Sequence, residues 1–318
     1  MDNILQIWDN DYEAKVSEHI KQLLNDKNSE LPLINYQSDQ KNLSTSPNDE
    51  QKISRVALER RKGYESALTG IYTEDMISNW CLQMELRNLQ ESKKISEYET
   101  FKKIVIEFLQ NVEKKEIKGS IYFASDMWTL VYYDGKNRKP LYNLSSGYHS
   151  LLCMIMELAY RAVSLNPALN NFKELEGVVL IDEIDMHLHP KWQWRVIGAL
   201  QETFPKVQFI VATHSPMIIS SAKEAKLIKM INPNEIEYLT SAYAYNIDDV
   251  LVFRQGSTAL PEEAKKLEDE LESYIDEGDF VNAEKTIQKA AVMFGENSSP
   301  VKNMKDELEV NKWIEEAE

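Results

Sequence analysis

Apolar residues recur at helical spacing in the first part of the chain, with one short exception. Residues 1–30 carry apolar side chains at loose helical intervals, which predicts a helix. The extended stretch LPLINY follows at residues 31–36, and the polar, turn-rich residues 37–52 predict a surface loop. Helical periodicity returns over residues 52–114, in the segments 53–68, 73–90 and 96–114. We therefore expect a helical region interrupted by one strand.

The pattern changes to alternation after residue 118. Residues 119–125 and 128–144 are rich in β-branched and aromatic side chains at alternating positions, which is typical of strands. The pair Asp134 and Gly135 predicts a hairpin turn within the second stretch. Beyond Gly147 the apolar positions lie almost all around a helix, so a buried helix is expected to begin at this glycine.

Further strands and helices then alternate. Residues 178–181 are all apolar and predict a central parallel strand, which ends on Asp182 and Glu183. The segment 190–204 begins with proline and predicts a helix. A second buried strand, VQFIVATH, ends on His214 and leads into another helix. This order predicts an α/β fold with a parallel sheet, and the acids and the histidine are expected at the edge where such sheets bind ligands.

The carboxyl-terminal segment differs from the rest in charge. Of the net charge of −16, residues 261–318 contribute −10, from 17 acidic residues and 7 lysines. This balance argues against a general nucleic-acid coat protein and leaves room only for a local basic patch. Apolar positions on either side of Gly278 predict two helices packed as a hairpin. The hairpin is expected either to cap the sheet or to dock a partner.

The amino end and the cysteines indicate the compartment. The opening residues MDNILQIWDN are acidic and do not have the basic start of a secretory signal, and no apolar run approaches the roughly 20 residues of a membrane span. The two cysteines, Cys81 and Cys153, are expected to be buried, reduced thiols. These features predict a cytoplasmic protein with no membrane partner.

Two short motifs carry candidate chemistry. Ser145, Ser146 and Gly147 lie where a loop opens into a helix, and backbone N–H groups at such a start suit a phosphate. Asp182 and Glu183 end a buried strand, at the edge where open α/β sheets bind ligands. Alternatives remain at both places: the acids could be a solvated strand end or a helix cap.

A third motif, His187 and His189, forms an H-x-H pair. Such a pair could ligate zinc. We favour the alternative, in which the pair belongs to a turn that leads into the proline-started helix at residue 190.

The ordered series LSSGYHS, VVLIDEID, HLHP and ATHSP, within residues 143–216, resembles the carboxyl-terminal half of an ABC-type ATPase of the kind found in recombination, repair and phage defence. Within that superfamily the chain most resembles the ATPase subunits of Septu and retron-associated defence systems, which are relatives of the overcoming-lysogenization-defect nucleases. The resemblance implies a P-loop NTPase-like fold with a parallel-sheet core, a helical insertion and a carboxyl-terminal helical hairpin.

The same resemblance implies a division into four regions. Residues 1–50 would be a remnant of the amino-terminal lobe with a loop, and residues 51–116 a helical insertion. Residues 117–255 would form the ATPase core, and residues 256–318 the acidic helical tail.

The resemblance also implies a role for each motif residue. Asp182 would hold Mg²⁺, and Glu183 would polarise the attacking water. His214 would contact the γ-phosphate of ATP, and Asp185 would belong to a loop that touches an opposite subunit.

Ser145, Ser146 and Gly147 would form the signature motif, which caps the ATP of a partner protomer. The resemblance therefore implies a dimer or higher homo-oligomer that assembles through this face.

One element of the family pattern is not found in these 318 residues. The P-loop sequence G-x-x-x-x-G-K-S/T should precede the signature, but the only Gly-Lys pair, Gly135 and Lys136, is followed by asparagine and has Leu130 where the first glycine should stand. We expect a sequence cut at its amino end, whether by truncation, by a split gene or by degeneration, and a chain that is inactive alone.

The predicted function is an ATP-gated dimerising switch that controls a separate effector such as a nuclease, with DNA contact possible. A scaffold that keeps the signature face without hydrolysing ATP is the first alternative. A transporter ATPase subunit is the second, and it is weakened by the long helical insertion.

Overall fold

The computed structural model describes residues 29–38, 60–70, 74–232, 234–256 and 260–317. The helix predicted over residues 1–30 and most of the loop predicted over residues 37–52 lie outside the described residues. The chain divides into two compact units, Met1–Tyr245 and Asn246–Glu318, which are described separately below.

A three-stranded parallel sheet forms the base of the first unit. Its strands are β1 (Leu33–Gln37), β5 (Gly177–Ile181) and β6 (Val207–Val211), in the order β1-β5-β6. Asn35 pairs with Val179, and Val179 pairs with Phe209, so the three strands run in register. The predicted central parallel strand is therefore confirmed as β5.

The two faces of this sheet are covered differently. Odd-numbered residues such as Leu33, Val179 and Ile181 are buried in the main hydrophobic core, while Leu180 and Ile210 on the other face are 36% and 50% exposed. The sequence predicted a central parallel strand and a second buried strand, and among the described residues the helices pack on one face of the sheet that these strands form.

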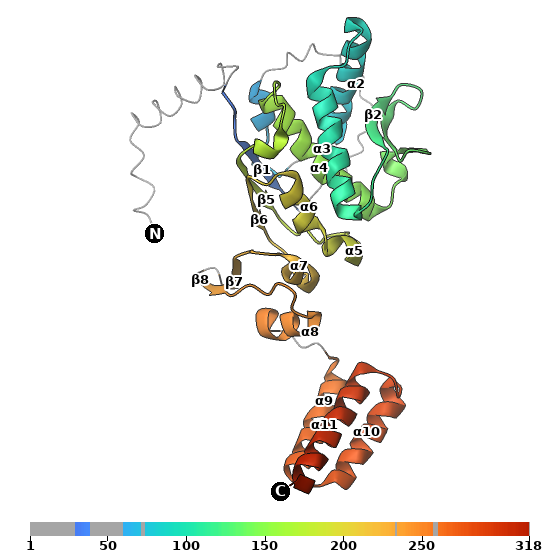
Figure 1. Cartoon of the computed structure of the whole chain (residues 1–318), viewed down its shortest axis with the longest axis vertical. Helices are drawn as coiled ribbons and strands as arrows, with labels where there is room; N and C mark the ends of the chain where they lie inside the picture. The colour runs from blue at the N-terminus through green and yellow to red at the C-terminus, as the bar shows by residue number, and fades with distance from the viewer. Residues whose placement is uncertain (1–28, 39–59, 71–73, 233, 257–259, 318) are drawn as a thin grey trace, which may run out of the picture. The chain divides into compact units, whose positions relative to one another are not determined.

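Helices cover the buried face. They include α2 (Glu74–Glu91), α3 (Ser96–Glu113), α4 (Ser146–Leu165) and α6 (Val196–Thr203), and Figure 1 shows α3, α4 and α6 together on one side of the sheet. Every residue of α4 from Leu151 onward is buried, as its continuous apolar sequence predicted. None of the helices in the described part of the chain is long and apolar enough to cross a membrane.

The segment before α2 differs from its prediction. A helix was expected over residues 53–68, but the described part of it is a 3-10 helix, η1 (Arg60–Tyr64), followed by turns up to Gly70. Gly70 has a φ of +69° and forms a parallel bridge with Gln37, and a Cβ at this position would clash with the side chain of Ser38. The segment is not helical at this point, where it runs alongside the end of β1.

The predicted hairpin is confirmed within a second sheet. Strands β2 (Ser120–Ala124), β3 (Thr129–Tyr133) and β4 (Arg138–Pro140) are antiparallel in that order. The turn lies at Asp134 and Gly135, where Asp134 Oδ1 accepts the N–H groups of residues 136 and 137 at 2.9 and 2.7 Å. A short 3-10 helix, η2 (Leu141–Asn143), then leads directly into α4.

The helix predicted over residues 190–204 is two helices, α5 (Pro190–Gln193) and α6. Between them the backbone of Arg195 departs from the helical region at φ −127°, ψ −20°. The guanidinium of Arg195 donates to the carbonyls of Val112 and Glu113 at 3.3 and 3.2 Å, which anchors the break to the end of α3.

The first unit is completed by four smaller elements. They are the 3-10 helix η3 (Phe172–Glu174), α7 (Pro216–Ser221) and the antiparallel strands β7 (Leu227–Asn232) and β8 (Glu235–Leu239).

The second unit begins with α8 (Ile247–Asp249) and the π-helix η4 (Val250–Gln255). The predicted hairpin is confirmed as α9 (Glu262–Asp276) and α10 (Phe280–Phe294), with Gly278 at φ +70° in the turn. A third helix, α11 (Ser299–Ala317), packs on both. The three helices share a small apolar core made of Leu267, Leu271, Ala283, Ile287, Ala290, Val301, Met304 and Leu308.

A buried ion pair within α4 joins the layers of the first unit. Arg161 donates to Glu157 Oε1 at 2.9 and 3.0 Å, and the two side chains are 1% and 6% exposed. Asn35 on β1 donates to the same oxygen at 2.8 Å. Arg161 also donates to the carbonyls of Gly63 and Glu65 at 3.0 and 2.9 Å. One carboxylate and one guanidinium thus connect the sheet, α4 and the end of η1 with the residue that follows it.

We expect Arg161→Met to lower the free energy of unfolding of the first unit by about 3 to 5 kcal/mol, because it leaves the Glu157 charge buried without its partner. Arg87→Met is the matched control: Arg87 and Glu91 are also four residues apart on a helix, but both are 36% exposed. The control should cost no more than about 0.5 kcal/mol. Urea denaturation followed by circular dichroism measures both, and equal losses would contradict the prediction.

Candidate functional site

The loop after β5 lies directly beyond the carboxyl end of the sheet. Its backbone extends the ladder on both sides: the Asp182 N–H donates to the Gln37 carbonyl at 2.9 Å, and the Ile184 N–H donates to the Ala212 carbonyl at 3.3 Å. Residues 182–185 are therefore fixed between the ends of β1 and β6, at the edge where open α/β sheets bind ligands.

Glu183 and His214 meet at this edge. The carboxylate Oε1 of Glu183 lies 3.6 Å from Nε2 of His214, whose side chain is 88% exposed while that of Glu183 is 35% exposed. Glu183 also has a φ of +47°, a left-handed backbone that costs a non-glycine residue on the order of 1–3 kcal/mol. Such strain is found mainly where a side chain must be aimed at a functional position.

Asp185 is held by a residue that the sequence analysis did not single out. The Thr213 hydroxyl makes a short hydrogen bond to the Asp185 carboxylate, and Thr213 Oγ1 accepts the N–H of Ser215 at 3.0 Å. Thr213 stands immediately before His214, so its hydroxyl fixes the loop after β5 to the loop after β6. The sequence feature that could have identified Thr213 is its position as a hydroxyl residue between the end of β6 and His214.

Ser215 and Gln193 form a second link that was missed. The buried hydroxyl of Ser215 donates to the Gln193 side-chain carbonyl at 2.7 Å and accepts the Ile218 N–H at 3.4 Å, which caps α7. The Gln193 amide donates to the Leu188 carbonyl at 3.0 Å. The loop after β5, α5 and α7 are thereby held as one assembly around the sheet edge.

Asp182 and Glu183 present oxygen ligands, which fits the preference of Mg²⁺ for carboxylates and water. Asp182 lies half-buried at the end of the central strand, with its backbone fixed to β1. The donor set therefore suits an Mg²⁺ ion, and Asp182 is the residue that would hold it.

The helix α4 begins on the neighbouring loop. Ser145 is its N-terminal cap residue without a side-chain capping bond, and Ser145 and Ser146 are both exposed. Gly147 is buried, and a Cβ at this position would lie 2.4 Å from the His187 carbonyl oxygen and 3.2 Å from Trp192. The sequence suggested that a glycine is needed here so that a phosphate can come close to the backbone. The structure gives a second reason, because the loop after Asp185 packs against this glycine.

Aromatic rings secure this contact. Tyr148 lies 5.5 Å from Tyr132 and 5.5 Å from Trp192, measured between ring centroids. The indole N–H of Trp192 donates to Glu113 Oε1 at 2.9 Å. Burial raises the pKa of Tyr148, so its hydroxyl stays protonated. Trp192 therefore packs against its own chain, as the sequence analysis favoured.

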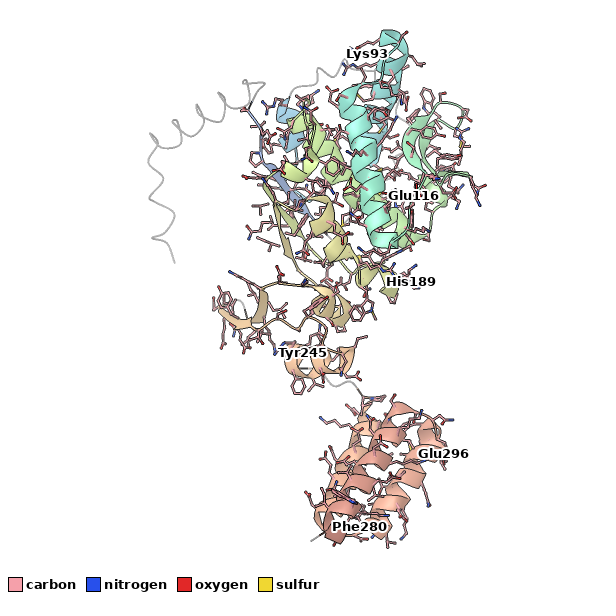
Figure 2. The ribbon with its side chains drawn as sticks, viewed as in Figure 1. Lys93, Glu116, His189, Tyr245, Phe280 and Glu296 are labelled. Atoms are coloured by element: carbon pink, nitrogen blue, oxygen red, sulfur yellow. The ribbon has the colours of Figure 1, made fainter. Side chains whose placement is uncertain are left out.

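The two histidines of the H-x-H pair lie in the turn that leads into α5. His189 lies at the start of α5 (Figure 2), where its Nδ1 accepts the Lys191 N–H at 3.2 Å as a helix cap. His187 has a φ of +63°. The residues that the structure describes do contain one group of potential metal ligands, but it lies elsewhere and includes neither histidine.

One family model matches more than half of the chain. Residues 13–220 match the family described as "AAA domain, putative AbiEii toxin, Type IV TA system". The chain is 40% identical over 124 residues to "Retron Vc95 probable ATPase" of Vibrio cholerae serotype O1 biovar El Tor, which covers 37% of this chain and 24% of that protein. It is 27% identical over 236 residues to "Septu protein PtuA" of Bacillus mycoides strain KBAB4, which covers 65% of this chain and 31% of the relative.

Among solved structures, the SMC head domain from Thermotoga maritima matches with a TM-score of 0.32 and 19% identity, over 45% of this chain and 47% of that one. Of the retron and Septu relatives named above, this chain spans less than a third of the length of each.

We expect Gly147→Ala to lower the free energy of unfolding by about 1–3 kcal/mol, because the new methyl group would overlap the His187 carbonyl. Gly198→Ala is the matched control, since nothing lies within 4 Å of a Cβ at that position in α6. The control should stabilise the chain by up to about 1 kcal/mol. Thermal unfolding of the two variants decides the matter, and a neutral Gly147→Ala would mean that the loop moves away without cost.

Proposed function

Because this chain belongs to the AAA domain family, we propose that it supplies the acidic and signature elements of an ATP-hydrolysing site in a defence-type ATPase. The observation that carries the proposal is the strained Glu183 beside His214 at the carboxyl end of the parallel sheet. A carboxylate fixed there, with an exposed imidazole within 4 Å, suits the activation of a water molecule next to a terminal phosphate.

In the proposed mechanism each residue of the edge has one task. ATP and Mg²⁺ are the cofactors, and Asp182 holds the ion. Glu183 accepts a proton from the attacking water, and His214 contacts the γ-phosphate. Asp185, positioned by Thr213, belongs to the loop that faces an opposite subunit.

The phosphate cradle itself is proposed to come from outside these 318 residues, since they contain no P-loop sequence. The open sheet face supports this proposal, because parallel sheets are ordinarily covered on both faces and here Leu180 and Ile210 are exposed. A polypeptide segment bearing the P-loop strand and helix would cover that face and bring its amides to the edge beside Asp182.

The exposed start of α4 is proposed to act across a subunit interface. Ser145 and Ser146 are exposed while Gly147 is packed inward, so the N-terminal turn presents the two serines to a ligand from outside the chain. A phosphate held by a second copy suits this geometry. ATP would then draw two copies together, and hydrolysis would release them.

The biological role is proposed from the relatives. We propose an ATPase of the retron and Septu type that works in the cytoplasm against phage, and the similarity to "Retron Vc95 probable ATPase" and "Septu protein PtuA" supports the ATPase part of this proposal. A separate effector, for which a nuclease is the leading candidate, would respond to the ATP state, and DNA is a candidate trigger. A scaffold that binds ATP without hydrolysing it is the second candidate, and it is disfavoured by the paired Glu183 and His214.

The purified 318-residue chain should neither bind ATP tightly nor hydrolyse it. A P-loop supplies several charge-assisted hydrogen bonds, each worth about 1.5–3 kcal/mol, and the loss of four corresponds to at least about four decades in Kd. A separate polypeptide that carries a P-loop strand and helix should restore turnover when it is co-expressed. Calorimetry on the chain alone and phosphate release from the pair measure this, and micromolar binding by the chain alone would contradict it.

In the restored assembly, Glu183→Gln should lower the hydrolysis rate by about 10²–10⁴-fold while ATP remains bound, because only the proton acceptor is removed. Asp182→Asn should instead weaken the dependence on Mg²⁺. Rates measured over a range of Mg²⁺ concentrations separate the two effects. An unchanged rate in Glu183→Gln would favour the scaffold.

The open sheet face can be tested apart from catalysis. Ile210→Asp should leave the chain folded, because Ile210 is half exposed, yet it should prevent co-purification with the P-loop polypeptide. Ile228→Asp on β7 is the matched control, with an isoleucine of similar exposure, 55%, away from the sheet face. Equal recovery of the P-loop polypeptide with both variants would show that this face is not the docking surface.

A further inference from the structure

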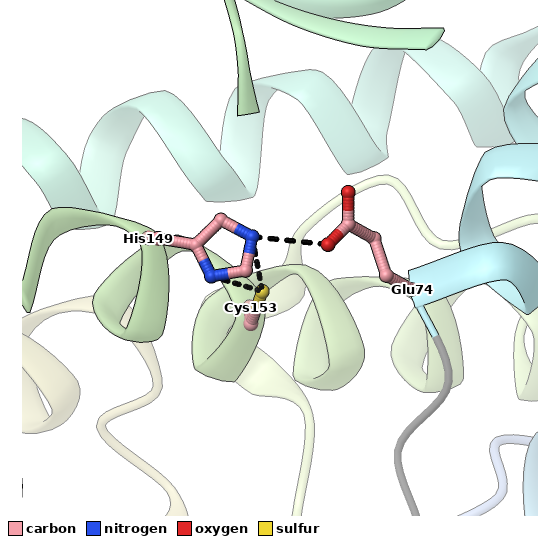
Figure 3. A group of neighbouring side chains, drawn as sticks. All are labelled: Glu74, His149 and Cys153. Carbon is pink, nitrogen blue, oxygen red and sulfur yellow. Dashed lines mark hydrogen bonds and ion pairs between the residues drawn. The ribbon is translucent and has the colours of Figure 1, made fainter. Parts of the chain in front are cut away.

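Three potential metal ligands meet between α2 and α4, apart from the sheet edge (Figure 3). The His149 Nε2 atom lies 3.0 Å from Glu74 Oε2, and the Cys153 sulfur lies 3.7 and 3.8 Å from the two ring nitrogens of His149. One ligand atom from each residue falls within 4.8 Å of the other two. Neither the fold nor the proposed ATP site makes use of this group, which we call the α2–α4 cluster.

The helix geometry explains why the ligands converge. His149 and Cys153 are four residues apart on α4, so their side chains lie on the same face one turn apart. Glu74 is the first residue of α2 and faces them from the opposite side. Because both helices are fixed in the main core, the three ligands are held on rigid elements.

The spacing suits a tetrahedral ion. Zinc binds Cys sulfur at about 2.3 Å, His nitrogen at about 2.0–2.1 Å and carboxylate oxygen at about 2.0–2.2 Å, which places neighbouring ligand atoms roughly 3.3–3.6 Å apart. The observed 3.0 Å and 3.8 Å lie on either side of that range. Small side-chain rotations would bring the three donors to one ion.

The Cys153 sulfur lies at nearly the same distance from both ring nitrogens of His149, 3.7 and 3.8 Å, so its hydrogen bond to the ring is not directed at one of them. An ion bound between the two side chains would replace this long contact with two shorter metal–ligand bonds.

Access also favours an ion at this place. Cys153 is 3% exposed, while the side chains of His149 and Glu74 are 13% and 30% exposed. An ion could enter from the Glu74 side and keep a water molecule as its fourth ligand, as zinc sites with three protein ligands do.

We propose that Glu74, His149 and Cys153 form a binding site for a divalent transition metal ion, with Zn²⁺ as the favoured occupant. The ion would fasten the start of α2 to α4 only two residues beyond Gly147. It would therefore stiffen the turn that presents Ser145 and Ser146.

The experiment uses the full 318-residue chain, stripped of metal with a chelator and then titrated with Co²⁺. We expect one equivalent of Co²⁺ to give thiolate-to-metal charge-transfer absorption, which Zn²⁺ should abolish by displacing it. Zn²⁺ should also raise the temperature of unfolding.

Variants assign the ligands. Cys153→Ser should remove the charge-transfer band, and His149→Asn and Glu74→Gln should each weaken Zn²⁺ binding at least on the order of tenfold. Glu74 is partly exposed, so Glu74→Gln is expected to stay folded, as circular dichroism can verify. Two controls should bind like the parent: Cys81→Ser, which removes the other buried thiol, and the double variant His187→Asn, His189→Asn, which removes the H-x-H pair.

The proposal is overturned if the parent chain shows no charge-transfer band with Co²⁺, or if the band survives in Cys153→Ser. It is also overturned if Glu74→Gln binds Zn²⁺ as tightly as the parent. In those cases the cluster is an ion pair between Glu74 and His149 that joins two helices, with the thiol packed beside it. Neither result would bear on the proposed ATP site.

Discussion

The burial of one carboxylate beside one guanidinium inside α4 is the constraint on which the first unit depends. Charges taken out of water are tolerated only with close partners, and Glu157 and Arg161 find them in each other, in Asn35 and in two backbone carbonyls. These partners come from the sheet and from residues 63–65. The helix α4 must therefore lie where its two charged side chains can reach them. The turn that begins α4, and with it Ser145 to Gly147, is placed by the same requirement.

The order of strands and helices could be predicted because the apolar pattern reflects burial directly. Residues 178–181 form the expected strand. The segment with apolar residues on all sides forms the expected buried helix, α4. Patterns could not reveal that the described helices leave one sheet face uncovered, because Leu180 and Ile210 are as apolar as the buried residues beside them. Nor could they predict the break between α5 and α6, which depends on a long-range bond from Arg195 to the end of α3.

The candidate site was predictable in its acids and histidine, and much less so in its supports. Asp182, Glu183 and His214 follow strand ends, where position along the chain implies position in space. Thr213, Gln193 and Ser215 support them through contacts between segments up to 28 residues apart, which no local spacing encodes. The same holds for the α2–α4 cluster, in which Glu74 lies 75 residues from His149.

The close approach of the His187 carbonyl to Gly147 brings the first turn of α4 against the loop that continues from Asp185. Both segments are proposed to face a neighbouring subunit. In a pair of copies with two nucleotides between them, movement of one segment would press on the other, so that the two sites would communicate.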